Sequence, residues 1–188
     1  EVANALPFLS SLTIVNSDGY VRCEAGSAQI RHFLGDQPFF LEAAQNAARV
    51  TGKVTDDPWT GKPGLPVSMQ IGGNADQPQV IAVAFIDIQW LQERLSEKTF
   101  EEGSSVTIAD RDGVILARVP EPERFIGTVV PDDFQYLIHE PKPGTLEVVS
   151  QDGTRRVLGY YPVTASPSGL YVSAGFSTQV GYRAYREI

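Results

Sequence analysis

Cysteine is nearly absent from this 188-residue sequence, because Cys23 is the only one. A single cysteine excludes a disulfide framework within the chain and a metal site built from several thiolates. Free cysteine usually behaves as a small, buried apolar side chain. The simplest interpretation places Cys23 half-buried on a strand.

Long hydrophobic runs are missing too. The longest, residues 80–88, already contains Asp87, whereas a membrane-spanning helix needs about twenty apolar residues. We therefore expect no membrane span within the chain. Glu1 is not a natural initiator and no signal peptide follows it, so we expect the chain to have been cut from a longer protein.

Basic side chains are outnumbered by acidic ones. Lysine and arginine together number 15 and aspartate and glutamate 23, which gives a formal net charge of −8. Such a field repels phosphate backbones and provides no basic surface for DNA or RNA. We expect no nucleic-acid partner.

Histidine, the commonest catalytic base, is scarce. His32 and His139 are the only two, and neither belongs to a nucleophile elbow of the form Gly-x-Ser-x-Gly. The sequence therefore offers no nucleophile with a recognisable base beside it. We expect neither enzymatic activity nor a cofactor.

One run faintly resembles a calcium-binding loop. It begins at Asp110, but Arg111 interrupts it and Ile115 occupies the sixth position, where such loops require glycine. Asp112 and Gly113 are instead typical of a tight hairpin turn. We favour the turn and expect no metal ion.

The first half of the sequence predicts a hairpin, a helix, a second hairpin and a short helix. The strands are expected over residues 12–16, 20–24, 67–71 and 79–87. Gly19 closes the first hairpin because glycine tolerates a positive φ. Asp36 is expected to cap the first helix, with Pro38 in its first turn and Gly52 past its end. Helical spacing returns over residues 88–95.

The second half repeats this order more weakly. Strands are expected over residues 106–109, 114–119, 145–150, 155–161 and 170–176, with a helical patch at 132–139. Gly19 and Gly113 occupy equivalent turns. The repeat predicts two copies of one antiparallel α+β unit, divided near residues 97–103.

The motifs in this order resemble the double Cache family of extracellular sensors. The resemblance rests on DQPFF at residues 36–40, TGKP at 60–63, FIDI at 85–88 and DRDGVILAR at 110–118, followed by Pro122, Glu123, Ile126 and Gly127. It implies an α+β fold of two PAS-like (Cache) lobes, each an antiparallel sheet flanked by helices, with stubs of N- and C-terminal stalk helices. The expected parts are residues 1–10 (the end of the first stalk helix), 11–96 (the membrane-distal, ligand-binding lobe), 104–176 (the membrane-proximal lobe) and 177–188 (the exit helix).

In that family the lobes lie outside the cytoplasm, in the periplasm of bacteria, between two membrane spans. A cyclase, histidine kinase or chemotaxis module follows on the cytoplasmic side. The resemblance therefore implies a non-enzymatic sensor that binds a small metabolite in the distal lobe and transmits a conformational change through a second lobe that relays it. It also implies a homodimer formed through the stalk helices, and membrane contact only through spans outside this chain.

The resemblance implies a ligand site in the distal lobe. The candidate residues are Gln37, Phe39 and Phe40 at the helix entrance, Asp57 and Trp59 in the following loop, Met69 on a strand and Asp87 at a strand end. Aromatic walls give apolar contact and a carboxylate fixes a polar head group. Members that recognise amines have an acidic residue at the position of Asp87, but an arginine and a tryptophan where Gln37 and Phe39 stand here, which does not favour an α-amino acid.

Several residues have alternative interpretations. Arg49 is a further ligand candidate because its planar guanidinium suits a carboxylate, although it could equally extend from a helix surface. Asp87 could instead cap the helix that begins at Ile88, and Trp59 could cover the edge of the core. Cys23 could pair with a cysteine upstream of Glu1, as in some similar chains.

Two other classes of function remain as alternatives. One is a small hydrolase or transferase. The other is a protein-interaction module without a small-molecule ligand, in which Tyr160, Tyr161 and Tyr171 would form an exposed docking patch.

Overall fold

The computed structural model describes residues 6–24, 32–46, 49–72 and 79–179. The chain divides into two compact units, Glu1–Leu91 and Gln92–Ile188. The division falls inside helix α3 (Ile88–Ser96), earlier than the expected boundary at 97–103, because α3 continues directly from the last strand of the first unit. Within the described ranges, no helix has the length and apolar character needed to cross a membrane.

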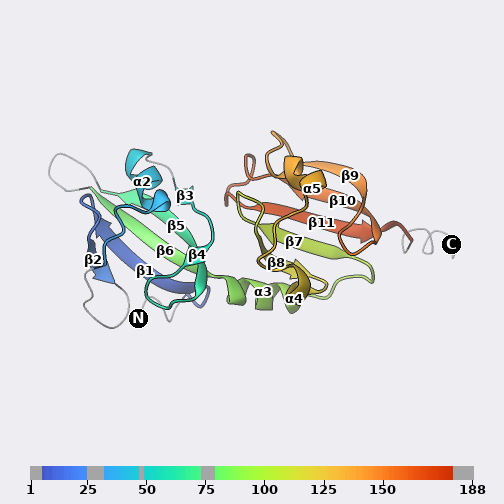
Figure 1. The fold of residues 1–188 in the computed structure, drawn as a ribbon, viewed down its shortest axis with the longest axis horizontal. Coiled ribbons are helices and arrows are strands. Elements are labelled where there is room, and N and C mark those ends of the chain that lie inside the picture. Colours follow the sequence, from blue (N-terminus) through green and yellow to red (C-terminus); the bar gives the residue numbers. More distant parts are fainter. Residues whose placement is uncertain (1–5, 25–31, 47–48, 73–78, 180–188) are drawn as a thin grey trace. The chain divides into compact units, whose positions relative to one another are not determined.

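The first unit is an antiparallel sheet with helix α2 (Pro38–Gln45) packed on one face (Figure 1). Its strands are β1 (Leu9–Asn16), β2 (Val21–Glu24), β3 (Val50–Thr51), β4 (Thr55–Asp56), β5 (Pro63–Ile71) and β6 (Val80–Asp87). The order across the sheet is β2-β1-β6-β5-β3, and β4 pairs with β5. Strands β1 and β6 alternate buried and partly exposed residues, so one face of the sheet carries the core.

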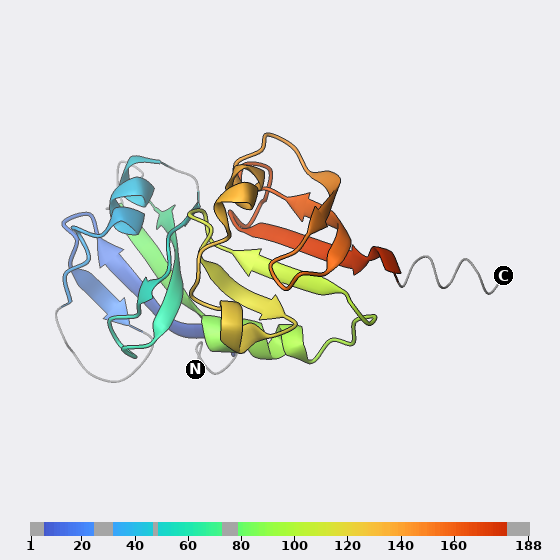
Figure 2. The same ribbon diagram turned by 45° about the vertical axis from the view of Figure 1, so that its right-hand side comes forward.

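The second unit is an antiparallel sheet with short helical segments (Figure 2). Its elements are β7 (Ser105–Ala109), β8 (Ile115–Val119), α4 (Pro122–Phe125), α5 (Asp132–Gln135), the 3-10 helix η1 (Tyr136–Ile138), β9 (Gly144–Val149), β10 (Arg155–Tyr161) and β11 (Tyr171–Ser177). Leu137 and Ile138 of η1 are buried in the core with Ala109 and Leu158.

The two sheets have the same strand order. In the second unit it is β8-β7-β11-β10-β9. In each sheet the second strand of the opening hairpin (β2 or β8) lies at one edge and the first strand (β1 or β7) lies next to it. The last strand of the unit (β6 or β11) then pairs with that first strand. The predicted α+β class and the internal repeat of one antiparallel unit are confirmed.

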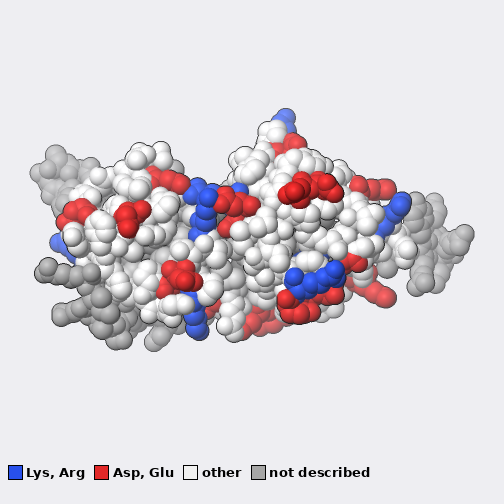
Figure 3. Space-filling view, viewed as in Figure 1, with Lys and Arg blue, Asp and Glu red and all other residues white. Residues whose placement is uncertain are grey.

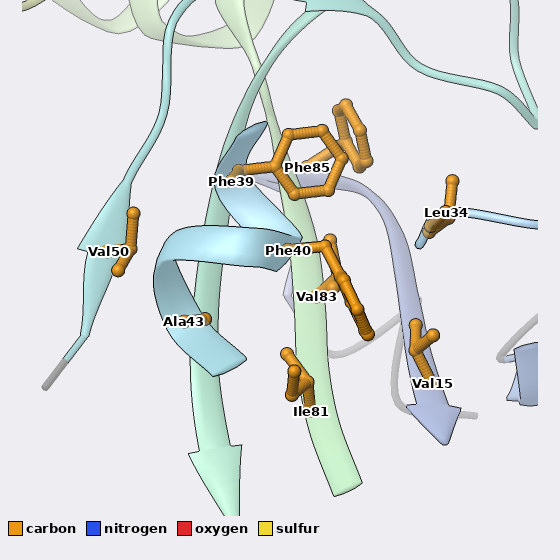
Figure 4. Close-up of a cluster of buried hydrophobic side chains, with 9 residues drawn as sticks. All are labelled: Val15, Leu34, Phe39, Phe40, Ala43, Val50, Ile81, Val83 and Phe85. Atoms are coloured by element: carbon orange, nitrogen blue, oxygen red, sulfur yellow. The ribbon is translucent and has the colours of Figure 1, made fainter. Parts of the chain in front are cut away.

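The core of the first unit lies between α2 and the sheet (Figure 4). Phe40 of α2 packs over Val83 and Ile81 of β6, and Phe39 lies beside Phe85. Burying an aromatic or branched side chain contributes roughly 1.5–3 kcal/mol. These contacts position α2, and with it the residues at its entrance.

The starts and ends of three predicted helices differ from expectation. Helix α2 begins at Pro38, and Gln37 rather than Asp36 occupies the N-cap position, because the residue before a proline favours an extended backbone. The expected stalk helix over residues 1–10 does not include Leu9 and Ser10, because β1 begins at Leu9, which pairs with Ile86 of β6; residues 1–5 lie outside the described residues. Strand β11 runs to Ser177, and most of the expected exit helix, residues 180–188, lies outside the described residues.

The turn between β7 and β8 follows the predicted hairpin chemistry. One carboxylate oxygen of Asp110 accepts the backbone N–H groups of Asp112 (3.0 Å) and Val114 (2.9 Å). Gly113 has a φ of 82°, and a Cβ atom there would lie 2.6 Å from Cδ1 of the buried Ile138. Glycine is therefore favoured at this position for two reasons: the backbone has a positive φ, and a Cβ atom would collide with Ile138.

We expect Gly113→Ala to destabilise the second unit by about 1–2 kcal/mol through its φ, and by at least about 1 kcal/mol more through the contact with Ile138. Gly153→Ala is the matched control, since its φ is 80° and nothing lies within 4 Å of its Cβ position. Denaturant unfolding of both variants measures the difference. Equal losses would contradict the packing argument.

Candidate ligand-binding sites

Phe85 is the centre of an aromatic group in the first unit. Its ring centroid lies 5.7 Å from that of Phe39 and 6.3 Å from that of Trp59. Trp59 in turn lies 5.3 Å from the ring of His32. Phe39 and Phe85 are buried, whereas Trp59 and His32 are partly exposed. The structure therefore brings two of the predicted residues, Phe39 and Trp59, together around Phe85; Figure 4 shows Phe39 beside Phe85.

Asp57 holds the loop that carries Trp59. Its side chain is fully buried. One carboxylate oxygen accepts the hydroxyl hydrogen of Ser10 at 2.6 Å, and the other accepts the backbone N–H of Trp59 at 2.9 Å. Both oxygens therefore have partners within the protein, and the role that the structure gives Asp57 is to position Trp59.

Two buried polar atoms near Phe85 have no hydrogen-bond partner among the residues that the structure describes. They are the indole nitrogen of Trp59 and the hydroxyl of Ser11. Ser11 of β1 pairs with Phe85 of β6, and residues directly opposite in an antiparallel pair place their side chains on the same face. An unsatisfied buried polar group costs about 1–3 kcal/mol. The described residues leave both groups without a hydrogen-bond partner.

Ser11 was not among the predicted site residues. The sequence does carry a signal for it, because Ser11, Thr13 and Val15 alternate along a strand whose inward residues are buried. A serine at an inward strand position needs a partner. The sequence alone, however, does not reveal that the described part of the chain supplies none.

Three further candidates lie at the ends of elements or in the core. Phe40 fills the centre of the core (Figure 4). The side-chain amide of Gln37 donates to Asp36 at 3.0 Å. A carboxylate oxygen of Asp87 accepts the backbone N–H of Trp90 at 3.1 Å, as in the helix-cap alternative. Ligand contact by any of them stays a prediction.

Met69 and Arg49 do not join the aromatic group. Ser68 points toward α2, where its hydroxyl donates to the carbonyl of Phe39 at 2.6 Å. Because side chains alternate along a strand, Met69 lies on the other face of the sheet, with 44% of its surface exposed. Arg49 is exposed just before β3, as the surface alternative predicted. Cys23 is also exposed, on β2, rather than half-buried.

The second unit contains a cavity of about 430 Å³, counting its open mouth. Its walls combine polar and apolar side chains. They are Ser105, Thr107, Ile115, Arg118, Val130, Pro131, Phe134, Val148, Ser150, Gln151, Leu158, Tyr171 and Ser173.

Arg118 is the only cationic side chain in that wall, and it is 5% exposed. One terminal nitrogen donates to the hydroxyl of Thr107 at 2.6 Å, and the guanidinium lies 4.3 Å from the ring centroid of Phe125. Its Nε and its other terminal nitrogen are buried without a partner. Burial lowers the pKa of Arg118, and the negative charge of Asp152 acts against this; arginine still stays protonated in proteins.

A second buried arginine in the same unit is fully engaged. Arg156 is 1% exposed and donates to Asp152 at 2.6 Å and to the carbonyl of Gly103 at 2.7 Å. Burial tends to raise the pKa of Asp152, but hydrogen bonds from Arg156 and from the backbone of Thr154 lower it to about 2. The two buried arginines therefore differ, because of the two only Arg118 has buried guanidinium nitrogens without a partner among the described residues.

The cavity was not predicted from the sequence, which suggested a second lobe that relays without binding. The signal was Arg118 itself, a charged residue at the end of the apolar run in β8. The predicted docking patch is not formed as such, because Tyr171 is 2% exposed and lines the cavity while Tyr160 packs against the core. Tyr161 alone is exposed.

The face drawn in Figure 3 carries both basic and acidic side chains, as expected from a composition with more acidic than basic residues. On the side drawn in Figure 3, the blue lysine and arginine side chains of the described residues form separate groups among red acidic ones. Within the described residues, no three histidine, cysteine, aspartate or glutamate side chains gather where they could hold a metal ion.

No protein-family model matches the chain, and no curated protein matches it. Several solved structures are similar to it. The extracellular domain of rpHK1S-Z16, a histidine kinase candidate, superposes with a TM-score of 0.75 at 20% identity, over 96% of this chain and 76% of that one. The ligand-binding domain of the Pseudomonas fluorescens chemoreceptor CtaA, solved with L-isoleucine, has a TM-score of 0.68 at 14% identity, over 96% of this chain and 74% of that one.

A third similar structure is the ligand-binding domain of the Pseudomonas aeruginosa PAO1 amino acid chemoreceptor PctB, solved with L-Gln. Its TM-score is 0.65 at 14% identity, over 95% of this chain and 72% of that one. These neighbours are ligand-binding and extracellular domains, not catalytic ones. The identities are low, so the likeness concerns the fold. This chain shares the two-unit α+β fold of these extracellular and ligand-binding domains.

Proposed function

We propose that the chain is the ligand-sensing domain of a bacterial extracytoplasmic receptor and that it binds a small metabolite in its first unit. The observation that carries the proposal is the pair of unpartnered buried groups, Trp59 Nε1 and Ser11 Oγ, beside Phe85 within this fold. The fold likeness to ligand-binding domains of chemoreceptors and to the extracellular domain of a histidine kinase candidate supports it.

The first unit favours a ligand with an apolar part and a hydrogen-bond acceptor. Phe39, Phe85 and Trp59 provide aromatic contact area, while the indole N–H and the Ser11 hydroxyl can donate. The neighbours CtaA and PctB were solved with amino acids. Here both carboxylate oxygens of Asp57 have protein partners, so an ammonium group would depend on Asp87.

A ligand transmits a signal only by binding one conformation of the receptor more tightly than another. In this proposal the stalk helices, joined in a homodimer, carry the change to a cytoplasmic histidine kinase, cyclase or chemotaxis module. The second unit lies between the first unit and the exit along the chain.

We expect a matching metabolite from a panel of organic acids, amines, amino acids, purines and sugars to raise the melting temperature by about 5 °C or more at saturation. Trp59→Phe should weaken its binding about tenfold, because the indole donor and part of the contact area are lost. Ser11→Ala should weaken binding less while leaving the ligand-free protein at least as stable. Calorimetric titration measures the affinities.

Trp90→Phe is the matched control. Trp90 is the other tryptophan of the chain. It lies on α3 and its ring packs against that of Phe8. Its replacement should leave the affinity unchanged. A ligand that binds wild type and Trp59→Phe equally would remove the first unit from the proposal, and a panel without any hit would remove small-molecule sensing.

A further inference from the structure

We propose that the cavity of the second unit is a separate binding site for a small hydroxycarboxylate, with Arg118 receiving the carboxylate and Gln151 the hydroxyl group. This site goes beyond the proposed function, which concerns the first unit. It rests on polar groups of the second unit that are buried without a hydrogen-bond partner among the described residues.

The first observation is the unmatched cation. Arg118 is 5% exposed, and its guanidinium donates to Thr107, but Nε and one terminal nitrogen have no partner among the described residues. Buried charged groups are normally paired and hydrogen-bonded. Arg156 in the same unit follows that rule through Asp152 and Gly103. The contrast indicates that the partner of Arg118 comes from outside the protein.

The second observation is that Arg118 is held in place. The side-chain oxygen of Gln92 accepts its backbone N–H at 2.7 Å, and the side-chain nitrogen of Gln92 donates to its carbonyl at 3.0 Å. The ring of Phe125 covers one face of the guanidinium. A planar fork fixed in this way loses little freedom on binding, and it matches a carboxylate through two parallel hydrogen bonds.

The third observation is an unmatched acceptor in the same wall. The side-chain oxygen of Gln151 is buried and has no hydrogen-bond partner. It requires a donor on the ligand. A hydroxyl group meets this need better than an ammonium group, because the cavity wall contains no acidic side chain and the nearby Asp152 is engaged by Arg156.

The remaining walls set the size of the ligand. Ile115, Phe134 and Leu158 are apolar, and serine hydroxyls such as Ser105 and Ser173 lie among them. A short carbon chain fits between them, whereas a large or multiply charged anion would leave charge in an apolar wall. Glycolate and L-lactate combine a carboxylate, a hydroxyl and a short carbon chain.

The test uses the whole chain and four probes: glycolate, L-lactate, propionate and L-lactamide. We expect glycolate or L-lactate to bind saturably at millimolar concentrations or below, propionate to bind about 3–10-fold more weakly for lack of the hydroxyl, and L-lactamide not to bind for lack of the charge. Inorganic phosphate is tested beside them. Tighter binding of phosphate than of either hydroxycarboxylate would overturn the assignment, as would the absence of binding by both.

Arg118→Met separates a ligand role from a structural one. We expect it to weaken hydroxycarboxylate binding at least about 30-fold and to leave the melting temperature of the ligand-free protein unchanged or higher, because an unmatched buried charge is replaced by an apolar side chain. A lower melting temperature, or unchanged affinity, would overturn the proposal. Arg155→Met, which removes an exposed arginine of the same unit, should change neither quantity.

Gln151→Met provides a second test that does not touch the buried charge. It should make L-lactate and propionate bind equally, and a retained preference for L-lactate would contradict the role of Gln151. The two sites remain distinguishable, because Arg118→Met should not affect a ligand that Trp59→Phe loses. A shared loss in both variants would mean that the second unit has no site of its own.

Discussion

Replacing Asp152 with alanine should destabilise the second unit by about 3–5 kcal/mol, since it leaves a buried cation without its counter-charge. Asp152 and Arg156 lie 2.6 Å apart, with side chains 8% and 1% exposed. Arg156 would keep only the carbonyl of Gly103. Denaturant unfolding, followed by amide hydrogen exchange to assign the loss to the second unit, measures the effect.

The surface pair Arg94–Glu97 is the matched control for Asp152. A guanidinium nitrogen of Arg94 lies 2.7 Å from a carboxylate oxygen of Glu97, a similar distance, but the two side chains are 53% and 58% exposed. Glu97→Ala should therefore change the free energy of unfolding by less than about 1 kcal/mol. Comparable losses in Asp152→Ala and Glu97→Ala would contradict the view that burial makes the first pair important.

The same ion pair predicts acid sensitivity. The folded-state pKa of Asp152 is about 2, below its ordinary value of 3.8. The stabilisation from this difference, about 2 kcal/mol, is therefore present above about pH 4 and is lost as the pH falls toward 2. Asp152→Asn should lack this part of the acid dependence, and an unchanged acid profile would contradict the assignment.

Phe85→Ala should destabilise the first unit by about 3–5 kcal/mol, because it empties the space between the rings of Phe39 and Trp59. Phe85 is 0% exposed and belongs to the central strand β6. The variant should also reduce ligand binding in the first unit, since Trp59 loses the ring it packs against. Hydrogen exchange of the first unit measures the stability.

Phe176→Ala is the control for Phe85→Ala. Phe176 is 58% exposed on β11, so its loss should cost well under 1 kcal/mol by the ordinary behaviour of surface positions. If both alanine variants lost similar stability, the core described for the first unit would be wrong.

Most strands could be predicted from the sequence because local chemistry decides them. Gly19 and Gly113 have φ values of 85° and 82°, as the hairpin turns predicted. In β6 the larger side chains Ile81, Val83 and Phe85 are the buried ones. The repeat of these signals was enough to indicate two copies of one unit. Strands β3 and β4 were missed because two residues carry no periodicity.

The sites were harder to predict because they depend on pairing across the chain. Met69 was placed with Phe39 by motif order, yet strand alternation and the bond from Ser68 to Phe39 set it on the other face. Ser11 and Arg118 matter because buried atoms in them lack partners. The absence of a partner is a property of the whole packed unit, and no local pattern reveals it.

The measurement that tests the central claim most directly is a two-dimensional amide NMR titration of the chain with the metabolite panel and the hydroxycarboxylates. Ligand sensing predicts saturable shifts that cluster around Ser11, Trp59 and Phe85 for one class of compound. Shifts around Arg118 and Gln151 are expected for glycolate or L-lactate. A well-folded spectrum that no compound changes saturably would contradict the claim that this chain senses a small molecule.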